Sequence, residues 1–331
     1  MDRIVFKKDG YDPLIDYIKG LCIIFVVLTH TMNRVELNQV LFPYWGDTAV
    51  PLFFVIQAFH YYKKDVGIRM PSIPKLLKRI LWPFIITICL MFLMQFFIYY
   101  DITNGSFSPI LYWDKRGPGS YYIPIYLEFA FIIPLFAPLF KRLSIKWTFL
   151  IFVILSQLLE FIACISRCPD SIYRVIFFRY TFVIFIGYLL ATKGLVINKL
   201  SIAAGVIGIF ALYLFNYTET DLEPLFYTSL SNWKYCHWIC YLYISYIFLW
   251  IIKRSYSYLI PHKGIATYIE EVGKYSYEIY LFQIFYYTII GPYIDTALSL
   301  WGNGIIQRIL YIIISTVICV VPVVYIKKKR W

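Results

Sequence analysis

Charged side chains are scarce in this 331-residue chain: only 15% of its residues are Asp, Glu, Lys or Arg, whereas 60% are hydrophobic. Soluble domains have about 25% charged and about 45–50% apolar residues. No polar stretch is long enough to form a soluble domain of its own. The composition therefore excludes an ordinary soluble protein.

The alternation of apolar and polar residues that a membrane β-barrel needs is also missing. Apolar residues instead come in about ten runs, mostly of the length with which a helix crosses about 30 Å of hydrocarbon. Helices satisfy their own backbone hydrogen bonds, which lipid cannot do for them. We expect an all-α, polytopic integral membrane protein, a single domain over residues 1–331, with spans near 14–33, 47–62, 80–100, 120–140, 147–165, 172–191, 198–215, 235–252, 275–292 and 305–326.

Acidic residues are few: the chain has 19 Asp and Glu against 31 Lys and Arg, a net charge of +12. Most of the basic residues fall at the two termini and in the connections around 63–79, 141–146, 193–199 and 253–274. This asymmetry is the positive-inside pattern, which predicts that both termini are cytoplasmic. The charge then reflects topology and attraction to anionic lipid, not nucleic-acid binding. We expect a multi-pass protein of the cell (cytoplasmic) membrane without a cleaved signal peptide.

Metal-ligand clusters are sparse as well, since the chain has only four histidines and seven cysteines. One segment, "CHWIC", brings together Cys236, His237 and Cys240. Two cysteines at helical spacing beside one histidine are more often ordinary packing than a metal site. We therefore expect no metal.

His30 is the unusual residue of the first apolar run, which Asp16 and Lys19 open. It lies about 24 Å along the predicted helix and about 21 Å from Asp16, so the two cannot form a dyad. Asp16 and Lys19, three residues apart, can pair with each other. A structural histidine at the interface and a catalytic base or nucleophile are both consistent with His30.

Six segments resemble, in order, the membrane-bound acyltransferase 3 family. The first span ends in the histidine typical of that family. The second has Gln57–Ala58 where Ser–Gly is commoner, and the fourth begins with Tyr121 and Tyr122 where many relatives have Trp and Phe. The segments are "IDYIKGLCIIFVVLTHT" (15–31), "VPLFFVIQAFHYYKK" (50–64), "KLLKRILWPF" (75–84), "GPGSYYIPIYLEF" (117–129), "RYTFVIFIGYLLA" (179–191) and "VGKYSYEIYLFQIFYY" (272–287).

The resemblance implies transfer of an acyl group, usually acetyl, from acyl-CoA to a hydroxyl of a cell-surface or exported polysaccharide. His30 would be the catalytic histidine. Arg79 and Lys75, with Lys19, would bind acyl-CoA, because a helix start that carries Lys75, Lys78 and Arg79 offers cationic donors to phosphates. A plain positive-inside flank is the alternative for this cluster. The expected partners are acyl-CoA, a glycan or lipid-linked glycan, membrane lipid and, at most, a second copy of the chain.

Further polar residues are candidates for the acceptor site or for stabilising an oxyanion. Each has a structural alternative: interfacial anchoring for the tyrosines, a helix–helix hydrogen bond for the carboxylates, and snorkelling for the arginine. We expect the cavity to be lined by the first, third and fourth spans, and the other histidines, His60, His237 and His262, to be dispensable. The candidates are Tyr121, Tyr122, Glu128, Glu160 and Arg179.

Two other functions fit the same composition. A polysaccharide or small-molecule transporter would tend to show paired, broken spans in matching halves, and the sequence has no such repeat. A non-catalytic membrane subunit would not need His30 and Arg79 together. Three points stay open here. They are the identity of the acceptor, whether the acyl group is acetyl or succinyl, and whether transfer is direct or passes through an acyl-histidine intermediate.

Overall fold

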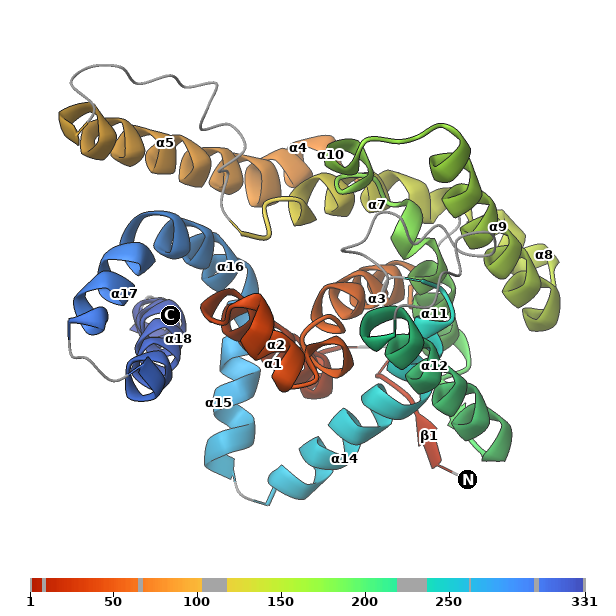
Figure 1. The fold of residues 1–331 in the computed structure, drawn as a ribbon. Coiled ribbons are helices and arrows are strands. Elements are labelled where there is room, and N and C mark those ends of the chain that lie inside the picture. Colours follow the sequence, from red (N-terminus) through yellow and green to blue (C-terminus); the bar gives the residue numbers. More distant parts are fainter. Residues whose placement is uncertain are drawn as a thin grey trace.

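Figure 1 shows the computed structural model of the chain, which describes residues 2–7, 10–64, 68–102, 118–218, 237–261, 263–300 and 304–329. The helices of its first half are α1 (Pro13–Thr31), α2 (Arg34–Gln39), the 3-10 turn η1 (Phe42–Tyr44), α3 (Ala49–Tyr62), α4 (Ile73–Leu76), the π-turn η2 (Leu77–Leu81), α5 (Trp82–Ile102), α7 (Tyr122–Leu135), α8 (Ala137–Arg142) and α9 (Ile145–Ile165).

The second half is also helical. Two short strands, β1 (Asp2–Ile4) and β2 (Leu195–Ile197), pair antiparallel with Arg3 opposite Val196. The helices are α10 (Asp170–Tyr173), η4 (Phe178–Tyr180), α11 (Thr181–Thr192), α12 (Lys199–Tyr217), α13 (Cys240–Tyr243), the π-turn η6 (Ile244–Phe248), α14 (Leu249–Leu259), α15 (Lys263–Lys274), α16 (Ser276–Phe285), the π-turn η7 (Tyr286–Ile290), α17 (Gly291–Ser299) and α18 (Gly304–Lys329).

Six helical stretches within the described ranges are long and apolar enough to cross a membrane. The all-α membrane architecture is thereby confirmed, whereas the total of ten spans and the cytoplasmic termini stay predictions. Other apolar segments are shorter, such as the 14-residue α3, or contain a π-turn, such as α13–α14 and α16–α17. The six stretches are Pro13–Thr31, Ile73–Ile98, Tyr122–Arg142, Ile145–Ile165, Lys199–Tyr217 and Gly304–Lys329.

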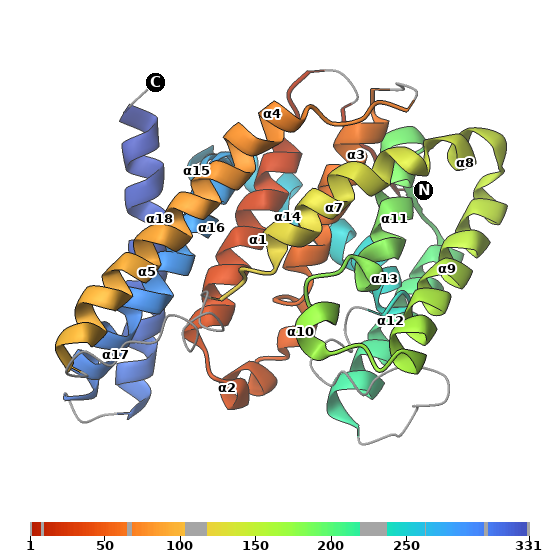
Figure 2. The same cartoon turned by 90° about the horizontal axis from the view of Figure 1, so that it is seen from above.

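Helix α1 lies at the centre of the helical array, and α5 lies at its edge (Figures 1 and 2). Within its most apolar window 56% of α1 is buried, against 11% of the stretch that contains α5. α1 starts where Pro13 occupies the first turn and the Asp12 carboxylate accepts a hydrogen bond from the Leu14 amide, a normal helix cap. The histidine at the far end of α1 is therefore held inside the protein and not on a lipid-facing helix.

The structure has a helix, α15, where the sequence predicted only a connection between two spans, residues 253–274. This helix packs against α1 so closely that neither helix has room for a side chain where the two cross. A Cβ atom built on Gly273 would lie 1.7 Å from the carbonyl oxygen of Asp16, and one built on Gly20 would lie 2.0 Å from that of Ile269. The two glycines let the backbones meet. The apolar-run criterion missed α15 because this helix is amphipathic.

The first strand and the last helix of the described residues are each tied to the body of the protein by lysine side chains. The Lys253 ammonium donates to the carbonyl oxygen of Arg3, next to the β1–β2 ladder. At the other end, Lys327 pairs with Glu278 and Lys328 with Glu271, each at 2.8 Å. Part of the basic tail is therefore neutralised by acidic side chains of α15 and α16.

Candidate active site

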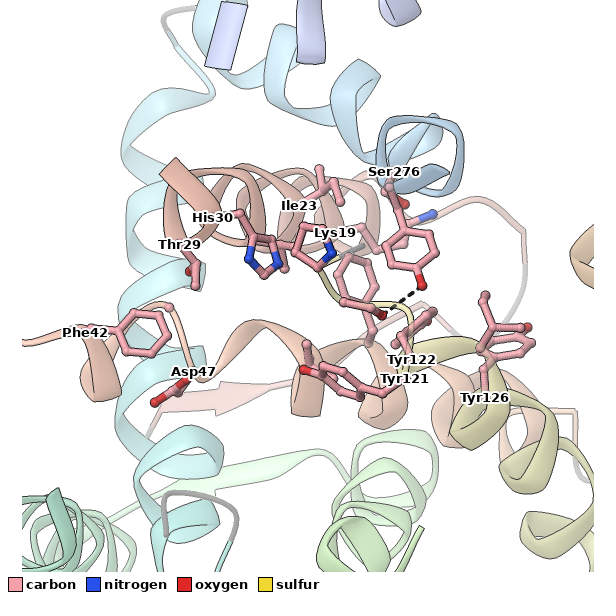
Figure 3. Close-up of a pocket in the computed structure, with 18 of the residues that line it drawn as sticks. Lys19, Ile23, Thr29, His30, Phe42, Asp47, Tyr121, Tyr122, Tyr126 and Ser276 are labelled. Atoms are coloured by element: carbon pink, nitrogen blue, oxygen red, sulfur yellow. Dashed lines mark hydrogen bonds between the residues drawn. The ribbon is translucent and has the colours of Figure 1, made fainter. Parts of the chain in front are cut away.

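A cavity of about 940 Å³ opens beside α1. Its walls come mainly from α1, α3, the segment before α7, and α16, with α2 and α12 near the far end of α1. The residues used below, several of which are labelled in Figure 3, are Lys19, Thr29, His30, Arg34, Asn38, Phe42, Gly46, Asp47, Phe53, Gln57, His60, Ile80, Gly119, Tyr121, Tyr122, Arg174, Asn216, Ser276, Tyr277 and Tyr280.

His30 projects from the last turn of α1 into this cavity (Figure 3). Its ring packs near Tyr287, with 6.0 Å between the ring centroids. Within the described ranges the imidazole nitrogens make no hydrogen bond. His30 therefore meets the first geometric requirement for a base or a nucleophile, which is access to a bound substrate.

Gly119 forms the wall of the cavity next to His30. Its φ of +80° is a left-handed conformation that side chains rarely allow. The Tyr280 hydroxyl donates a 2.9 Å hydrogen bond to the Gly119 carbonyl oxygen and so attaches this segment to α16. A Cβ atom on Gly119 would lie 3.7 Å from Nε2 of His30. Glycine thus keeps a small space open beside the imidazole.

Lys19 and His60 line the cavity at the end where α1 begins and α3 ends. The Lys19 ammonium forms an ion pair with Asp16, which confirms the predicted pair. His60 lies close enough to Lys19 and Lys63 for their charges to act on it. His60 shares the cavity with His30, because the face of α3 that carries it turns toward α1. Its dispensability stays a prediction. His262 lies outside the described residues.

Polar side chains gather where α1 ends. Arg34 and Asn38 come from α2, Asn216 from α12, and Asp47 from the turn before α3. Gly46 lets this turn approach α1, since a Cβ atom there would lie 3.0 Å from Oγ1 of Thr29 and closer still to the Phe42 ring. This end of the cavity therefore offers both hydrogen-bond donors and acceptors to a hydroxyl.

The predicted tyrosines line the cavity, and two predicted carboxylates do not. Tyr122 stacks on Phe54 with 5.1 Å between ring centroids, and Tyr121 lies over the Arg179 guanidinium at 5.1 Å. Glu128 accepts a 2.8 Å hydrogen bond from the Phe177 amide.

Glu160 and Arg179 lie behind the wall that Tyr121 forms. Glu160 accepts a 2.6 Å hydrogen bond from the Tyr173 hydroxyl, and Arg179 donates at 3.0 Å to the carbonyl oxygen of Arg174. These contacts hold the segment around residues 170–180 in place. Glu160 thus makes a hydrogen bond between helices, and Glu128 makes one to a backbone amide, so the contacts of both carboxylates favour a structural role over contact with a sugar.

The predicted phosphate-binding cluster lies at the surface. Arg79 and Lys75 are exposed and are not part of the cavity wall, whereas the neighbouring Ile80 is. The π-turn η2 contains both Arg79 and Ile80, and the Ile80 carbonyl oxygen accepts a hydrogen bond from Tyr277 of α16. Arg79 thus stands one residue away from the lining.

The prediction that the first, third and fourth spans line the cavity is incomplete, because α3 and α16 also form part of its wall. Among the described side chains of the third span only Ile80 lines the cavity, whereas α3 supplies Phe53, Gln57 and His60 among others. These three residues recur at i, i+4 and i+7, the spacing of one helix face. That periodicity in the second span was the signal available in the sequence.

Metal ligands do not cluster in the part of the chain that the structure describes. Cys236 of the "CHWIC" segment lies outside that part. His237 contacts Oε1 of Gln157 through Nε2 at 3.2 Å, and its ring packs against Phe215. These contacts fit a structural histidine.

Arg308 of α18 holds the end of α1 that carries His30. Its guanidinium donates at 2.8 Å to the carbonyl oxygen of Thr31 and at 2.8 and 2.9 Å to the Glu36 carboxylate. The hydrogen bond from Arg308 holds the pKa of Glu36 below its usual range. A carboxylate with a lowered pKa stabilises the fold above its unfolded-state pKa, and the contribution is lost as pH falls through the folded-state value.

We therefore expect Arg308→Gln to lower the Tm at pH 7 by the equivalent of about 1 kcal/mol, a modest value because the Arg308 and Glu36 side chains are 27% and 26% exposed. The difference from wild type should begin to shrink as pH falls below the usual carboxyl value of about 4.3, and it should vanish once pH has passed through the lowered folded-state pKa of Glu36. Asp295→Asn is the control. Asp295 also pairs with Arg308, but at the longer distance of 3.5 Å, so its loss should change the Tm less. Thermal unfolding in detergent across pH measures this, and a difference that does not depend on pH would contradict it.

Comparison with known proteins identifies the family of the chain. The family model described as an acyltransferase domain, Acyl_transf_3, matches residues 12–324, which include all the cavity residues named above. No curated protein and no solved structure matches the chain. Since the match covers nearly the whole length, the chain belongs to the acyltransferase 3 family.

Proposed function

We propose that the chain is an O-acyltransferase of the cell membrane that moves an acyl group such as acetyl from acyl-CoA to a hydroxyl of a cell-surface or exported polysaccharide. Membership of the acyltransferase 3 family and the apolar helices support membrane acyl transfer in general. The donor, the acceptor and the role of His30 are the proposal.

The observation that carries the proposal is the reach of one cavity along α1. Lys19 and His30 both line it, and eleven residues of helix separate them by about 16 Å. Beyond His30 the lining continues to Arg34, Asn38 and Asp47. A donor entering beside Lys19 and an acceptor entering beside Asp47 would meet at His30.

His30 would act there as the base that takes the proton of the acceptor hydroxyl, or as the nucleophile that carries the acyl group between the substrates. A sugar hydroxyl has a pKa far above 7 and reacts slowly until its proton is removed. Both routes place the thioester carbonyl beside the imidazole. Trapping of an acyl-protein after rapid mixing with radiolabelled acetyl-CoA distinguishes the second route from the first.

We expect Arg79→Ala to weaken acyl-CoA binding about ten- to hundredfold, because a charge-assisted hydrogen bond to phosphate contributes about 1.5–3 kcal/mol. In this proposal Arg79 and Lys75 hold the phosphates at the rim and Lys19 lies further in. Lys63→Ala is the matched control, since Lys63 is basic and near the same end but packs over Phe59. Titration of acyl-CoA onto both purified variants measures this, and equal affinities would refute the assignment.

The function itself is tested by giving the purified full chain, in proteoliposomes, acetyl-CoA and a glycan extract of the cell that expresses it. The expected result is release of free CoA together with acetylated glycan detected by mass spectrometry. Movement of glycan across the bilayer without acetylation would support the transporter alternative instead.

A further inference from the structure

The side-chain amide of Gln283 is buried without a hydrogen-bond partner among the described residues. Gln283 lies on α16 and is 0% exposed, yet neither its Oε1 nor its Nε2 has a hydrogen-bond partner within the described ranges. Burying an unsatisfied amide is unfavourable, and native proteins keep few such groups. An apolar side chain of the same size would fill this position better.

The amide lies next to the small space that Gly119 keeps open. The point where a Gly119 Cβ atom would stand lies 3.6 Å from Nε2 of Gln283 and 3.7 Å from Nε2 of His30. Tyr280 closes a third side, with its Cε2 atom 3.5 Å from the same point. We call this space the Gly119 niche. Two polar nitrogens from helices far apart in the sequence thus lie beside Gly119, at a space the size of one methyl group.

We propose that the carbonyl oxygen of the acyl thioester lies against Gly119 at this niche and that the Gln283 amide donates a hydrogen bond to it. This inference rests on the proposed function. The other polar group nearest the niche is already used, because the Tyr280 hydroxyl donates to the Gly119 carbonyl oxygen. The tyrosines expected to supply an oxyanion partner, Tyr121 and Tyr122, line the same cavity, and Tyr122 packs between Phe54 and Tyr280.

The chemistry of acyl transfer needs such a donor in either route. A lone pair of the attacking atom forms a bond to the carbonyl carbon, and the carbonyl π electrons move to oxygen, which becomes negative. When this pair returns, the C–S bond breaks and the CoA thiolate leaves with its electrons. In direct transfer His30 takes the hydroxyl proton and passes it to the thiolate. A donor preorganised in a water-poor site stabilises the negative oxygen more than water does.

The test compares Gln283→Met with wild type in the acetyl-CoA assay described above. Loss of one oxyanion donor typically lowers kcat about 10²–10³-fold. We expect that loss here, with little change in KM for acetyl-CoA and with a Tm equal to or above that of wild type, since the variant no longer buries an unpaired amide. A lower Tm with kcat per folded molecule retained would mean that Gln283 is structural, and would overturn the inference.

Gln283→Glu separates donation from acceptance. Burial favours the neutral carboxyl, which can donate to an oxyanion, whereas the carboxylate formed at higher pH can only accept. We therefore expect Gln283→Glu to lose activity as pH rises through the pKa of the introduced carboxyl, a loss that wild type does not show. A pH profile equal to that of wild type would overturn the donor role.

Gln95→Met is the matched control. Gln95 is a second buried glutamine with an unpartnered Oε1, but it lies on α5 and, unlike Gln283, is not among the nearest neighbours of Gly119. It should keep wild-type kcat. If wild-type protein transfers no acyl group, the proposed function fails; if Gln283→Met transfers at the wild-type rate, only this inference fails.

Discussion

His30→Ala should lower acyl transfer about 10²–10⁴-fold, the usual contribution of a general base. The variant should still fold, insert and bind acyl-CoA, because the imidazole lines a cavity, makes no hydrogen bond within the described ranges, and lies about 16 Å from Lys19 along α1. Removing it leaves no buried polar partner unsatisfied. Turnover of acetyl-CoA and its binding affinity, measured on the same purified sample, separate loss of chemistry from loss of binding.

His237→Ala is the control for this prediction. His237 is buried away from the cavity lining and contacts Gln157, so its loss should lower stability and leave turnover per folded molecule near wild type. His60 cannot serve as a control, since it shares the cavity with His30. Near-normal transfer by His30→Ala at matched folding would mean that the imidazole is structural.

Gly273→Ala should destabilise the protein severely, because its methyl group would stand 1.7 Å from the Asp16 carbonyl oxygen and 2.8 Å from the amide nitrogen of Gly20. These are backbone atoms, so α1 and α15 must move apart. Overpacking a well-packed position costs about 1–3 kcal/mol and sometimes more. Thermal unfolding in detergent measures the loss. The shift should also move Lys19 and so weaken acyl-CoA binding.

Gly264→Ala is the comparison within the same helix, since a Cβ atom there meets nothing within 4 Å. Replacing an exposed helical glycine with alanine normally stabilises by about 0.5–1 kcal/mol. The two substitutions should therefore change the Tm in opposite directions. A similar Tm for both variants would show that the crossing of α1 and α15 is looser than described.

Much of the architecture could be predicted from the sequence because lipid imposes simple rules on it. Long apolar runs had to be helices, and α1 with His30 near its end follows from one such run. The helix α15 could not be found in this way, because an amphipathic segment with Lys263 and Lys274 at its ends has no long apolar run. Its packing against α1 depends on Gly20 and Gly273, and only the structure shows that these two glycines lie where the helices cross.

The candidate site was predictable where it depends on one helix and not where it depends on several. His30 and Lys19 share α1, so their separation follows from helix geometry. The Gly119 niche joins a loop, α1 and α16, and no local pattern places Gln283 beside His30. Nor does sequence tell a carboxylate that meets a substrate from one that accepts a hydrogen bond, as Glu160 does from Tyr173.

The pairing of β1 with β2 has a consequence for synthesis. Ile4 pairs with Leu195, so the first residues of the chain have no partner until residues 195–197 have left the ribosome. At about 5–20 residues per second this takes about 10–40 s. An unpaired strand edge is open to mispairing during that interval. Strand β1 must therefore wait on the side of the membrane where β2 will emerge, and the completed ladder links residues 2–4 to residues 195–197.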